Sequence, residues 1–162
     1  MGVVCLCPKV LVIYDSNTGN TEKLAKAVAK GAKQVSGVVV EVKRTELVES
    51  QDVVGADGYA IGSPSHFSVM SGKVLTLLTK LYSLRHKMAG KPMAVFTTGT
   101  GGQVLALENI DRIIGVFNPM FIKPGIVIET VPERANPWEI DEKQAMNLGR
   151  NLAEATVKQS QQ

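Results

Sequence analysis

The sequence is poor in several residue types, and each shortage excludes a class of protein. Aromatic residues make up 5% of the 162 residues, and the net charge is only +3. The dense basic surface interleaved with aromatics that is typical of nucleic-acid binders is therefore absent. The longest apolar runs are of strand length, which excludes a membrane-spanning helix. Only two cysteines and two histidines occur, which leaves little material for a metal site.

The N-terminus offers two incomplete motifs. Cys5-Leu6-Cys7 cannot close a zinc site by itself, and only His66 and His86 could assist from distant positions. Gly2 follows Met1 as in a myristoylation signal, but Leu6 stands where Ser or Thr is required. The first residues also lack the basic, apolar and small-residue segments of a secretory signal. We therefore interpret the thiols as incidental and expect a cytoplasmic protein without a metal.

Length and composition predict one globular domain. The chain has 44% hydrophobic and 20% charged residues, the balance of a domain that is large enough to bury a core. No repeat, linker or low-complexity tract interrupts it. We expect an N-terminal extension at residues 1–8, a single domain at residues 9–157 and a loose tail at residues 158–162.

Strand and helix patterns alternate along this domain. We expect strands in short apolar or β-branched runs, and helices where apolar residues recur every three or four positions. The expected strands cover residues 9–14, 38–42, 57–62, 92–98 and 125–129. The expected helices cover residues 20–35, 71–83, about 104–113 and 138–157. Residues 48–56 and 85–91 are predicted to be ordinary charged connectors.

Each expected helix has an apolar face that should pack on the sheet. The predicted inward residues are Leu24, Val28, Ala32 and Val35 in the first helix, Val74, Leu75, Leu78, Leu81 and Tyr82 in the second, Val104, Leu107, Ile110 and Ile113 in the third, and Ala145, Leu148 and Leu152 in the last. The lysines at positions 23, 26, 30 and 33 fall on the opposite face of the first helix. We interpret this lysine row as a solvated surface.

These elements predict a doubly wound α/β fold. The first strand is apolar on both faces, which is typical of a central strand in a parallel sheet with helices on both faces. Five parallel strands joined by right-handed crossovers then give the order 2-1-3-4-5. In such a sheet, ligands bind beyond the carboxyl ends of the strands, at the switch point between strands one and three.

The loop after the first strand has the composition of a phosphate cradle. It consists of the seven small or polar residues Asp15-Ser16-Asn17-Thr18-Gly19-Asn20-Thr21, and its glycine lets the backbone approach a ligand closely. The helix that follows would direct free N–H groups and its positive dipole end at a phosphate. No lysine or arginine lies in the loop, so hydroxyl and amide groups would hold the anion. The alternative is a serine- and threonine-rich helix cap that binds no ligand.

Two better-known glycine loops do not fit this chain. The P-loop requires Gly-Lys-Ser/Thr after four intervening residues, whereas Asn20 follows Gly19 and no earlier glycine lies in range. The dinucleotide fingerprint would use Gly99 and Gly101, but Val104 stands where Gly or Ala is required. The sequence therefore supports neither nucleoside triphosphate hydrolysis nor a Rossmann dinucleotide site.

The loops after the third and fourth strands are also unusual. They are residues 62–68, Gly-Ser-Pro-Ser-His-Phe-Ser, and residues 97–103, Thr-Thr-Gly-Thr-Gly-Gly-Gln. Phe67 or His66 could lie beside a flat ring, and the glycines of the second loop would let main chain pass close to the polar edge of that ring. His66 could also donate a proton or a hydrogen bond. The alternatives are that Phe67 is a core residue and that His66 is solvated.

The three loops resemble those of flavodoxin-like FMN proteins. The run of residues 16–21 is similar to the FMN-phosphate loop of that family, and residues 62–67, 70–72 and 98–103 are similar to loops of the NAD(P)H:quinone oxidoreductases of the tryptophan-repressor-binding-protein type. The resemblance covers about residues 9–157 and implies a flavodoxin-like fold with FMN as the cofactor. The implied cofactor-binding residues are Ser16, Asn17, Thr18, Gly19, Asn20 and Thr21 for the phosphate, and Ser63, Pro64, Ser65, His66, Phe67, Thr98, Gly99, Thr100, Gly101 and Gly102 for the ring. His66 is the one catalytic candidate.

Two departures from that oxidoreductase type change what it implies. The type has Arg-Phe-Gly in the middle loop, where this chain has His66-Phe67-Ser68, so the charge beside the ring differs. The type also carries a long insertion after the fifth strand, whereas residues 126–138 leave only a short connector here. In that type the insertion supports tetramer assembly and shapes the substrate pocket. The resemblance therefore decides neither whether this chain forms a homo-oligomer nor what shape its substrate pocket has.

The resemblance implies a reductase that passes electrons from NAD(P)H through FMN to quinone-like small molecules. The alternative is a flavodoxin-type carrier that moves single electrons between redox protein partners. Carriers of that kind tend to be acidic and carry an aromatic in the third loop, and this chain departs from both features. A phospho-switch of the same topology would need acidic residues after strands one and three, whereas Gly62-Ser63 ends strand three.

Overall fold

A parallel sheet forms the middle layer of the structure, which is a computed structural model that describes residues 7–131 and 138–162. Its strands are β1 (Lys9–Tyr14), β2 (Val39–Arg44), β3 (Gly58–His66), β5 (Pro92–Gly99), β6 (Met120–Phe121) and β7 (Ile126–Glu129), and β4 (Val69–Met70) pairs with β3 as an antiparallel hairpin. The strands lie in the order β2-β1-β3-β5, and both β6 and β7 pair with β5. The predicted order 2-1-3-4-5 is confirmed, because β6 and β7 together fill the fifth place.

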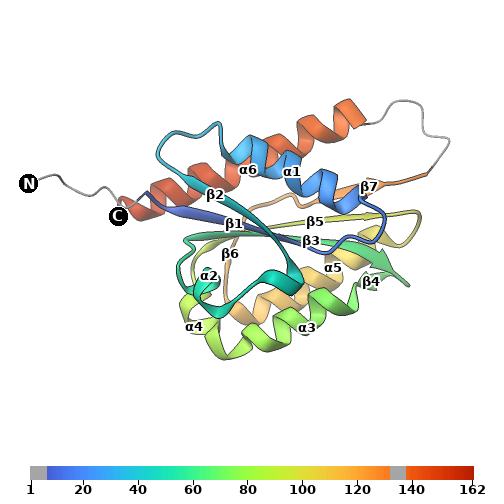
Figure 1. Cartoon of the computed structure of the whole chain (residues 1–162), viewed down its shortest axis with the longest axis horizontal. Coiled ribbons are helices and arrows are strands. Elements are labelled where there is room, and N and C mark those ends of the chain that lie inside the picture. Colours follow the sequence, from blue (N-terminus) through green and yellow to red (C-terminus); the bar gives the residue numbers. More distant parts are fainter. Residues whose placement is uncertain (1–6, 132–137) are drawn as a thin grey trace, which may run out of the picture.

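Helices cover both faces of this sheet, as the sequence predicted (Figure 1). One face carries α1 (Asn20–Ala32) and α6 (Trp138–Ser160). The other face carries α2 (Ser50–Val54), α3 (Gly72–Leu81), α4 (Arg85–Met88) and α5 (Gln103–Ile114). Within the described residues, three short 3-10 turns are η1 (Thr45–Leu47), η2 (Tyr82–Leu84) and η3 (Gly115–Phe117).

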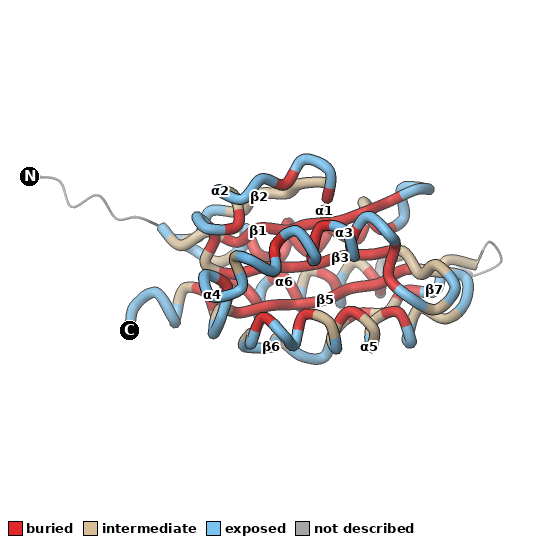
Figure 2. Tube along the Cα trace, turned by 90° about the horizontal axis from the view of Figure 1, so that it is seen from below, coloured by how far each residue is buried: buried red, intermediate tan, exposed pale blue. Residues whose placement is uncertain are grey.

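Alternation along β1 divides the core into two halves. Leu11 and Ile13 join the apolar cluster under α3 and α5, whereas Val10, Val12 and Tyr14 join the cluster under α1 and α6. Figure 2 shows the central strands β1, β3 and β5 buried over most of their length, and β2 at the edge only partly covered. The apolar run of β1 therefore marks a central strand, as predicted.

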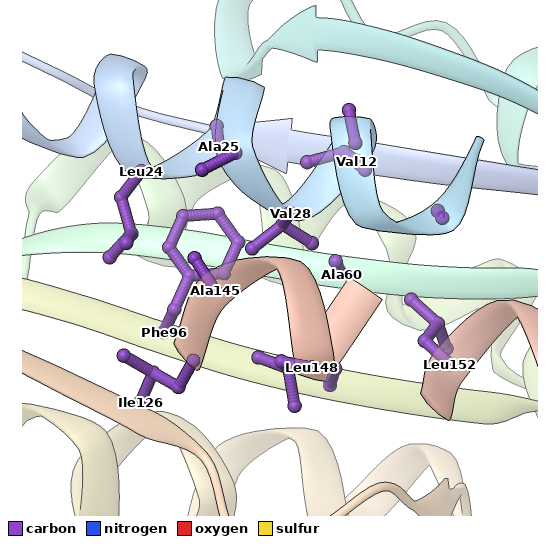
Figure 3. Packing of buried hydrophobic residues seen from close by; sticks show 14 of the residues in the cluster. Val12, Leu24, Ala25, Val28, Ala60, Phe96, Ile126, Ala145, Leu148 and Leu152 are labelled. Atoms are coloured by element: carbon purple, nitrogen blue, oxygen red, sulfur yellow. The ribbon is translucent and has the colours of Figure 1, made fainter. Parts of the chain in front are cut away.

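The predicted inward faces of α1 and α6 are confirmed. Figure 3 shows their side chains packed over Phe96 of β5 and Ile126 of β7. The confirmed buried residues are Leu24, Val28, Ala32, Ala145, Leu148 and Leu152. Val35 is partly buried against the same cluster, and the four lysines of α1 and its C-terminal end are exposed.

Three predicted inward residues are exposed instead. Leu75, Tyr82 and Val104 are 44%, 50% and 54% accessible. In α3 the buried stripe runs through Leu77 as well as Leu78, which turns Leu75 away from the sheet. The prediction from apolar spacing alone therefore assigned too many residues to the buried faces of these helices.

Other differences concern the ends and connections of elements. The two predicted connectors contain α2 and α4; in α2 a capping box between Glu49 and Asp52 begins the helix. α6 continues to Ser160, so the prediction of a loose tail is wrong for residues 158–160. Gln159 Nε2 donates a hydrogen bond to the Gly90 carbonyl oxygen at 2.8 Å, which holds this last turn against the domain.

The N-terminal predictions fall mostly outside the described residues, which exclude Gly2 and Cys5. Cys7 is exposed and carries a free thiol. Within residues 7–131 and 138–162, no helix is long and apolar enough to cross a bilayer. The same residues contain no cluster of three side chains suited to a metal ion.

α1 and α6 approach each other closely because each has a glycine at their crossing. A Cβ on Gly31 would lie 1.9 Å from the Met146 carbonyl oxygen, and a Cβ on Gly149 would lie 1.8 Å from that of Val28. Both neighbours are backbone atoms, so a methyl group could fit only if the two helices moved apart.

Gly31→Ala should therefore lower the free energy of unfolding by about 1–3 kcal/mol, the usual cost of overpacking, measured by urea denaturation. Gly115→Ala is the matched control, because a Cβ there meets nothing within 4 Å. The control should be neutral or slightly stabilising. Equal unfolding free energies for the two variants would contradict the close crossing.

Candidate cofactor site

Three loops meet at the carboxyl edge of the sheet (Figure 1). The cradle, residues 15–21, follows β1 and touches both of the other loops. Asn17 Nδ2 lies 3.2 Å from His66 Nε2 at the end of β3. The buried hydroxyls of Thr21 and Thr98 are hydrogen-bonded at 2.7 Å, which ties the start of α1 to the end of β5.

The middle and third loops also touch each other. Ser65 Oγ donates a hydrogen bond to the Gly101 carbonyl oxygen at 3.1 Å. Gly102 lies so close to the hairpin that a Cβ would come within 2.2 Å of Ser68 Oγ. The predicted convergence of the three loops is thus observed, whereas their role in holding a cofactor stays a prediction.

The cradle presents an open helix start. Gly19 caps α1 with φ +91° and ψ −10° and without a side-chain hydrogen bond to the helix, and its own N–H donates to Ser16 Oγ at 3.1 Å. The first helical bond is donated by Lys23 N–H to the Gly19 carbonyl oxygen. The N–H groups at positions 20, 21 and 22 therefore precede the helical ladder and are available to an anion. A Cβ on Gly19 would meet nothing within 4 Å, so the space beside it is open.

A cation borders the cradle although none lies within it. Arg44, at the end of β2, donates from Nη2 to the Ser16 carbonyl oxygen at 2.8 Å and from Nε to Glu46 Oε1 at 3.1 Å. Its Nη1 also lies 3.7 Å from Glu22. The guanidinium is therefore engaged in fixing the loop, and the backbone and hydroxyl groups remain the donors for an anion.

Glu46 is held as a carboxylate. A hydrogen bond from its own backbone amide, followed by those from Thr45 and Arg44 and by the charge of Lys73, outweighs burial and lowers the pKa of Glu46 to about 2. A hydrogen bond from Lys26 likewise lowers the pKa of Glu22. The rim of the site thus keeps fixed charges of both signs over the physiological pH range.

The middle loop is more ordered than the sequence predicted. β3 continues to His66 and turns back into β4 through Phe67 and Ser68. These two residues have φ values of +51° and +66°, the two left-handed residues of a type I′ hairpin turn, where Asn and Gly are usual. The Phe67 side chain is 103% exposed, so the alternative that it is a core residue is excluded. A strained turn that holds an aromatic ring in solvent beside two other loops points to function.

Ser63 and Thr98 are buried, and their hydroxyls are already in use. Ser63 Oγ donates to the Pro64 carbonyl oxygen and accepts from Ser71 N–H, both at 2.8 Å. Ser71 in turn caps α3 by accepting from Val74 N–H at 3.3 Å. The side chains of Ser63 and Thr98 thus hold the loops in position. Any contact of these two residues with a cofactor would come from their backbone groups. Pro64, Ser65, His66, Gly99 and Gly102 are partly buried and Thr100 and Gly101 are exposed at the same edge.

Sequence reasoning missed two buried oxygen atoms at this edge. Asp15 Oδ1 and Gln103 Oε1 accept no hydrogen bond from any described residue. Such atoms are costly unless a ligand or another partner supplies a donor. Asp15 belongs to the cradle and Gln103 to the third loop, both of which stand out in the sequence by their polar composition. Only the fold shows that these two side chains are buried.

The residues present fit FMN. The open N–H groups and the unfilled space at Gly19 suit a phosphate. Gln103 Oε1 lies beside Gly99, 3.5 Å from where a Cβ would stand, and offers an acceptor to a ring N–H. The position for the phosphate is surrounded by Ser16, Asn17, Thr18, Asn20 and Thr21.

Two hollows flank the cradle. A hollow of about 290 Å³ joins Asn20 of the cradle to Thr98 of the third loop, on the side of α1 and α6. A larger one of about 620 Å³ joins Asn17 to His66, on the side of α3. Volumes of this order are typical of small-molecule sites.

Comparisons with known proteins agree with this geometry. The sequence model of the family described as flavodoxin matches residues 12–113. A protein named flavodoxin from Aquifex aeolicus is 32% identical over 163 residues, which cover 90% of this chain and 85% of that protein. A protein named NAD(P)H dehydrogenase (quinone) from Archaeoglobus fulgidus is 28% identical over 194 residues, which cover 93% of this chain and 98% of that protein.

The fold is also found among solved structures. A flavodoxin from the domain Archaea superimposes with a TM-score of 0.81 at 23% identity, covering 91% of this chain and 98% of its own. At that identity the likeness concerns the fold alone. The flavodoxin-like α/β fold predicted from the sequence is confirmed.

Gly19→Ala should weaken FMN binding by roughly tenfold or more, because an alanine resists the left-handed backbone that opens the helix start. Gly37→Ala is the matched control: Gly37 has φ +75° and equally open surroundings but lies outside the three loops. Both variants should lose similar stability, and only the first should lose affinity, measured by quenching of FMN fluorescence. Wild-type affinity in Gly19→Ala would overturn the cradle assignment.

The Thr21–Thr98 hydrogen bond can be tested by a double-mutant cycle. Thr21→Val or Thr98→Val alone leaves a buried hydroxyl without its partner, which should cost about 1–3 kcal/mol. The double variant removes both hydroxyls and should cost clearly less than the sum of the single costs. Additive losses in urea denaturation would show that the two hydroxyls do not depend on each other.

Proposed function

The chain belongs to the flavodoxin family, and from this premise we propose that it is an FMN-dependent reductase that uses NAD(P)H to reduce quinone-like small molecules. FMN is the cofactor of that family. When bound, it supplies the capacity to accept a hydride and to return electrons singly or in pairs. The contribution of the protein is to bind, orient and shield the reactants.

The observation that carries the proposal is the composition of the third loop. Residues 99–103 contain no aromatic side chain, and Thr100 and Gly101 are exposed. A planar substrate could therefore approach from this side without displacing a bulky residue. The relative from Archaeoglobus fulgidus that is named NAD(P)H dehydrogenase (quinone) supports the same activity.

The cradle would bind the phosphate through the open N–H groups at the start of α1 and through its hydroxyls. Arg44, held on the Ser16 carbonyl oxygen, keeps the loop in the shape that this requires. Thr21 and Thr98 keep the cradle and the third loop at a fixed separation. Such fixed donors stabilise a bound anion without reorganising at each turnover.

His66 is the candidate for moving a proton. The Asn17 amide nitrogen can only donate, so a neutral His66 ring that accepts this bond at Nε2 carries its proton on Nδ1. Asn17 thereby fixes the orientation and tautomer of the imidazole. A substrate or a reduced ring on the Nδ1 side could receive that proton or a hydrogen bond.

A carrier of single electrons between proteins is the second candidate. The relative named flavodoxin from Aquifex aeolicus, at 32% identity, favours it. The fully exposed Phe67 at the edge of the sheet would suit contact with a partner protein as well as with a small molecule. The small positive net charge of +3 is the feature that separates this chain from acidic carriers.

Anaerobic mixing with nucleotide separates the two functions. A reductase loaded with FMN should lose its flavin absorbance within seconds on addition of NADH or NADPH, and benzoquinone should restore the colour. Free FMN at the same concentration is the control for reaction without the protein. Slow bleaching by both nucleotides, together with two well-separated one-electron steps in a chemical reductive titration, would reject the reductase and favour the carrier.

A further inference from the structure

The two helical layers expose different kinds of side chain. Within the described residues, α1 and α6 expose no large apolar side chain, and their outer surface carries the lysine row of α1 and Lys143 of α6. The layer of α3 and α5 instead exposes Leu75 of α3, Tyr82 of η2, Leu105 of α5 and Val116 of η3. A gathering of exposed apolar side chains is typical of a surface that contacts another molecule.

These apolar side chains lie on neighbouring elements. α3 and α5 cover the same face of the sheet (Figure 1) and bury their inner sides in one apolar cluster. Near the start of α3, Met70 N–H donates to Asn109 Oδ1 of α5 at 3.2 Å. Beyond the end of α3, the rings of Tyr82 and Phe117 meet edge to face with their centroids 6.5 Å apart. The outer sides of the two helices therefore form one surface, which we name the α3–α5 face.

A stripe of alternating character runs along the α5 part of this face. Four exposed residues recur at intervals of three or four positions and therefore project from one side of the helix: Leu105, Glu108, Arg112 and Val116. The backbone stays right-handed helical at Gly115, which carries the stripe on into η3. Leu105 and Val116 are 55% and 56% exposed. An acidic and a basic residue thus lie between two apolar ones.

The two charges in the middle of the stripe are unpaired within the part of the chain that the structure describes. Glu108 and Arg112 are exposed, and neither side chain makes an ion pair with a described residue. Residues four apart on a helix can pair with each other, but these two do not. Each is available to an opposite charge on another molecule. A second copy of the same stripe offers both charges at the matching separation.

We propose that the α3–α5 face binds a second copy of this chain in a two-fold dimer, an inference that does not depend on the proposed function. When two α5 helices cross antiparallel with the axis near position 110, Glu108 of each copy lies opposite Arg112 of the other. Leu105 then lies opposite Val116, and the exposed apolar side chains beside α5 extend the contact. Such an interface is isologous, because every contact in it occurs twice.

Other occupants match the stripe less well. A lipid bilayer would take Glu108 and Arg112 out of water without giving either charge a partner. A partner protein with a surface of one sign would pair with one of the two residues and repel the other. Only a surface with both charges in reversed order satisfies both, and an antiparallel copy of α5 presents that order.

The cofactor sites lie outside this interface. The third loop directly precedes α5, so an antiparallel pair places the two third loops at opposite ends of the dimer. None of the stripe residues belongs to the three loops. Substitutions in the stripe should therefore leave FMN binding and the circular dichroism spectrum unchanged, which separates loss of the dimer from loss of the fold.

Sedimentation velocity over a range of protein concentrations tests the dimer. The wild-type protein should show a reversible monomer–dimer equilibrium. Glu108→Arg and Arg112→Glu each replace two attractive pairs with two repulsive ones, so each should raise the dissociation constant roughly tenfold or more. Glu154→Arg and Lys33→Glu are the matched controls, because they make the same charge changes at exposed positions in α6 and just beyond α1, and they should dimerise like wild type.

Mixing the two variants tests the pairing itself. An equimolar mixture of the Glu108→Arg and Arg112→Glu proteins restores opposite charges at both contacts, so it should form a one-to-one heterodimer of near wild-type affinity. A chain that carries both substitutions should likewise recover the homodimer. A wild-type protein that stays monomeric up to about 0.1 mM, or single variants that dimerise like wild type, would overturn the inference. Weakened dimers without recovery in the mixture and in the double variant would show that Glu108 does not face Arg112.

Discussion

Burial of β1 on both faces is the constraint on which the rest of the structure depends. Its side chains enter two separate apolar clusters, so a slip of one residue would exchange the side chains between the clusters and, in one direction, carry the charged Lys9 into the buried place of Val10. The register therefore aligns Tyr14 with Gly62, and Gly62 with Phe96. The cradle, the hairpin and the third loop consequently begin at nearly the same level of the sheet. The site follows from that alignment, since each loop alone is only a short polar segment.

The site divides into parts with different electrostatic character. Residues 16–21 of the cradle carry no charged side chain and offer N–H groups and hydroxyls, and the adjacent cation, Arg44, is already engaged. The α3 side combines the buried carboxylate of Asp15 with exposed lysines. The third loop carries neither charge nor aromatic side chains. If the protein is the proposed reductase, this separation would let reactants exchange while the donors that anchor the phosphate stay undisturbed.

The sequence predicted most of the fold because its signals were local and periodic. The apolar run of β1 and the spacing of Leu24 and Val28 in α1 agree with their burial. The β3–β4 hairpin was missed because its turn residues, Phe67 and Ser68, adopt left-handed conformations without the Asn or Gly that would announce them. Likewise, no periodic pattern in the sequence indicated that two short strands, β6 and β7, would share the position of the fifth strand.

The site was predicted only in part, for a related reason. The cradle has a local composition that indicates its chemistry, so residues 16–21 could be proposed without a structure. Asp15 and Lys73 are 58 positions apart along the chain, and their approach depends on how α3 packs beside η1. Pairings across such separations come from topology and burial, which residue spacing does not reveal.

Backbone amide NMR of the FMN-free protein titrated with FMN tests whether all three loops hold one FMN. Large shift changes are expected at residues 16–21, 63–67 and 98–102, saturating together at one affinity, with little change at residues 85–91 on the opposite edge. Saturation without shifts at residues 16–21, or with the largest shifts outside these three loops, would contradict it.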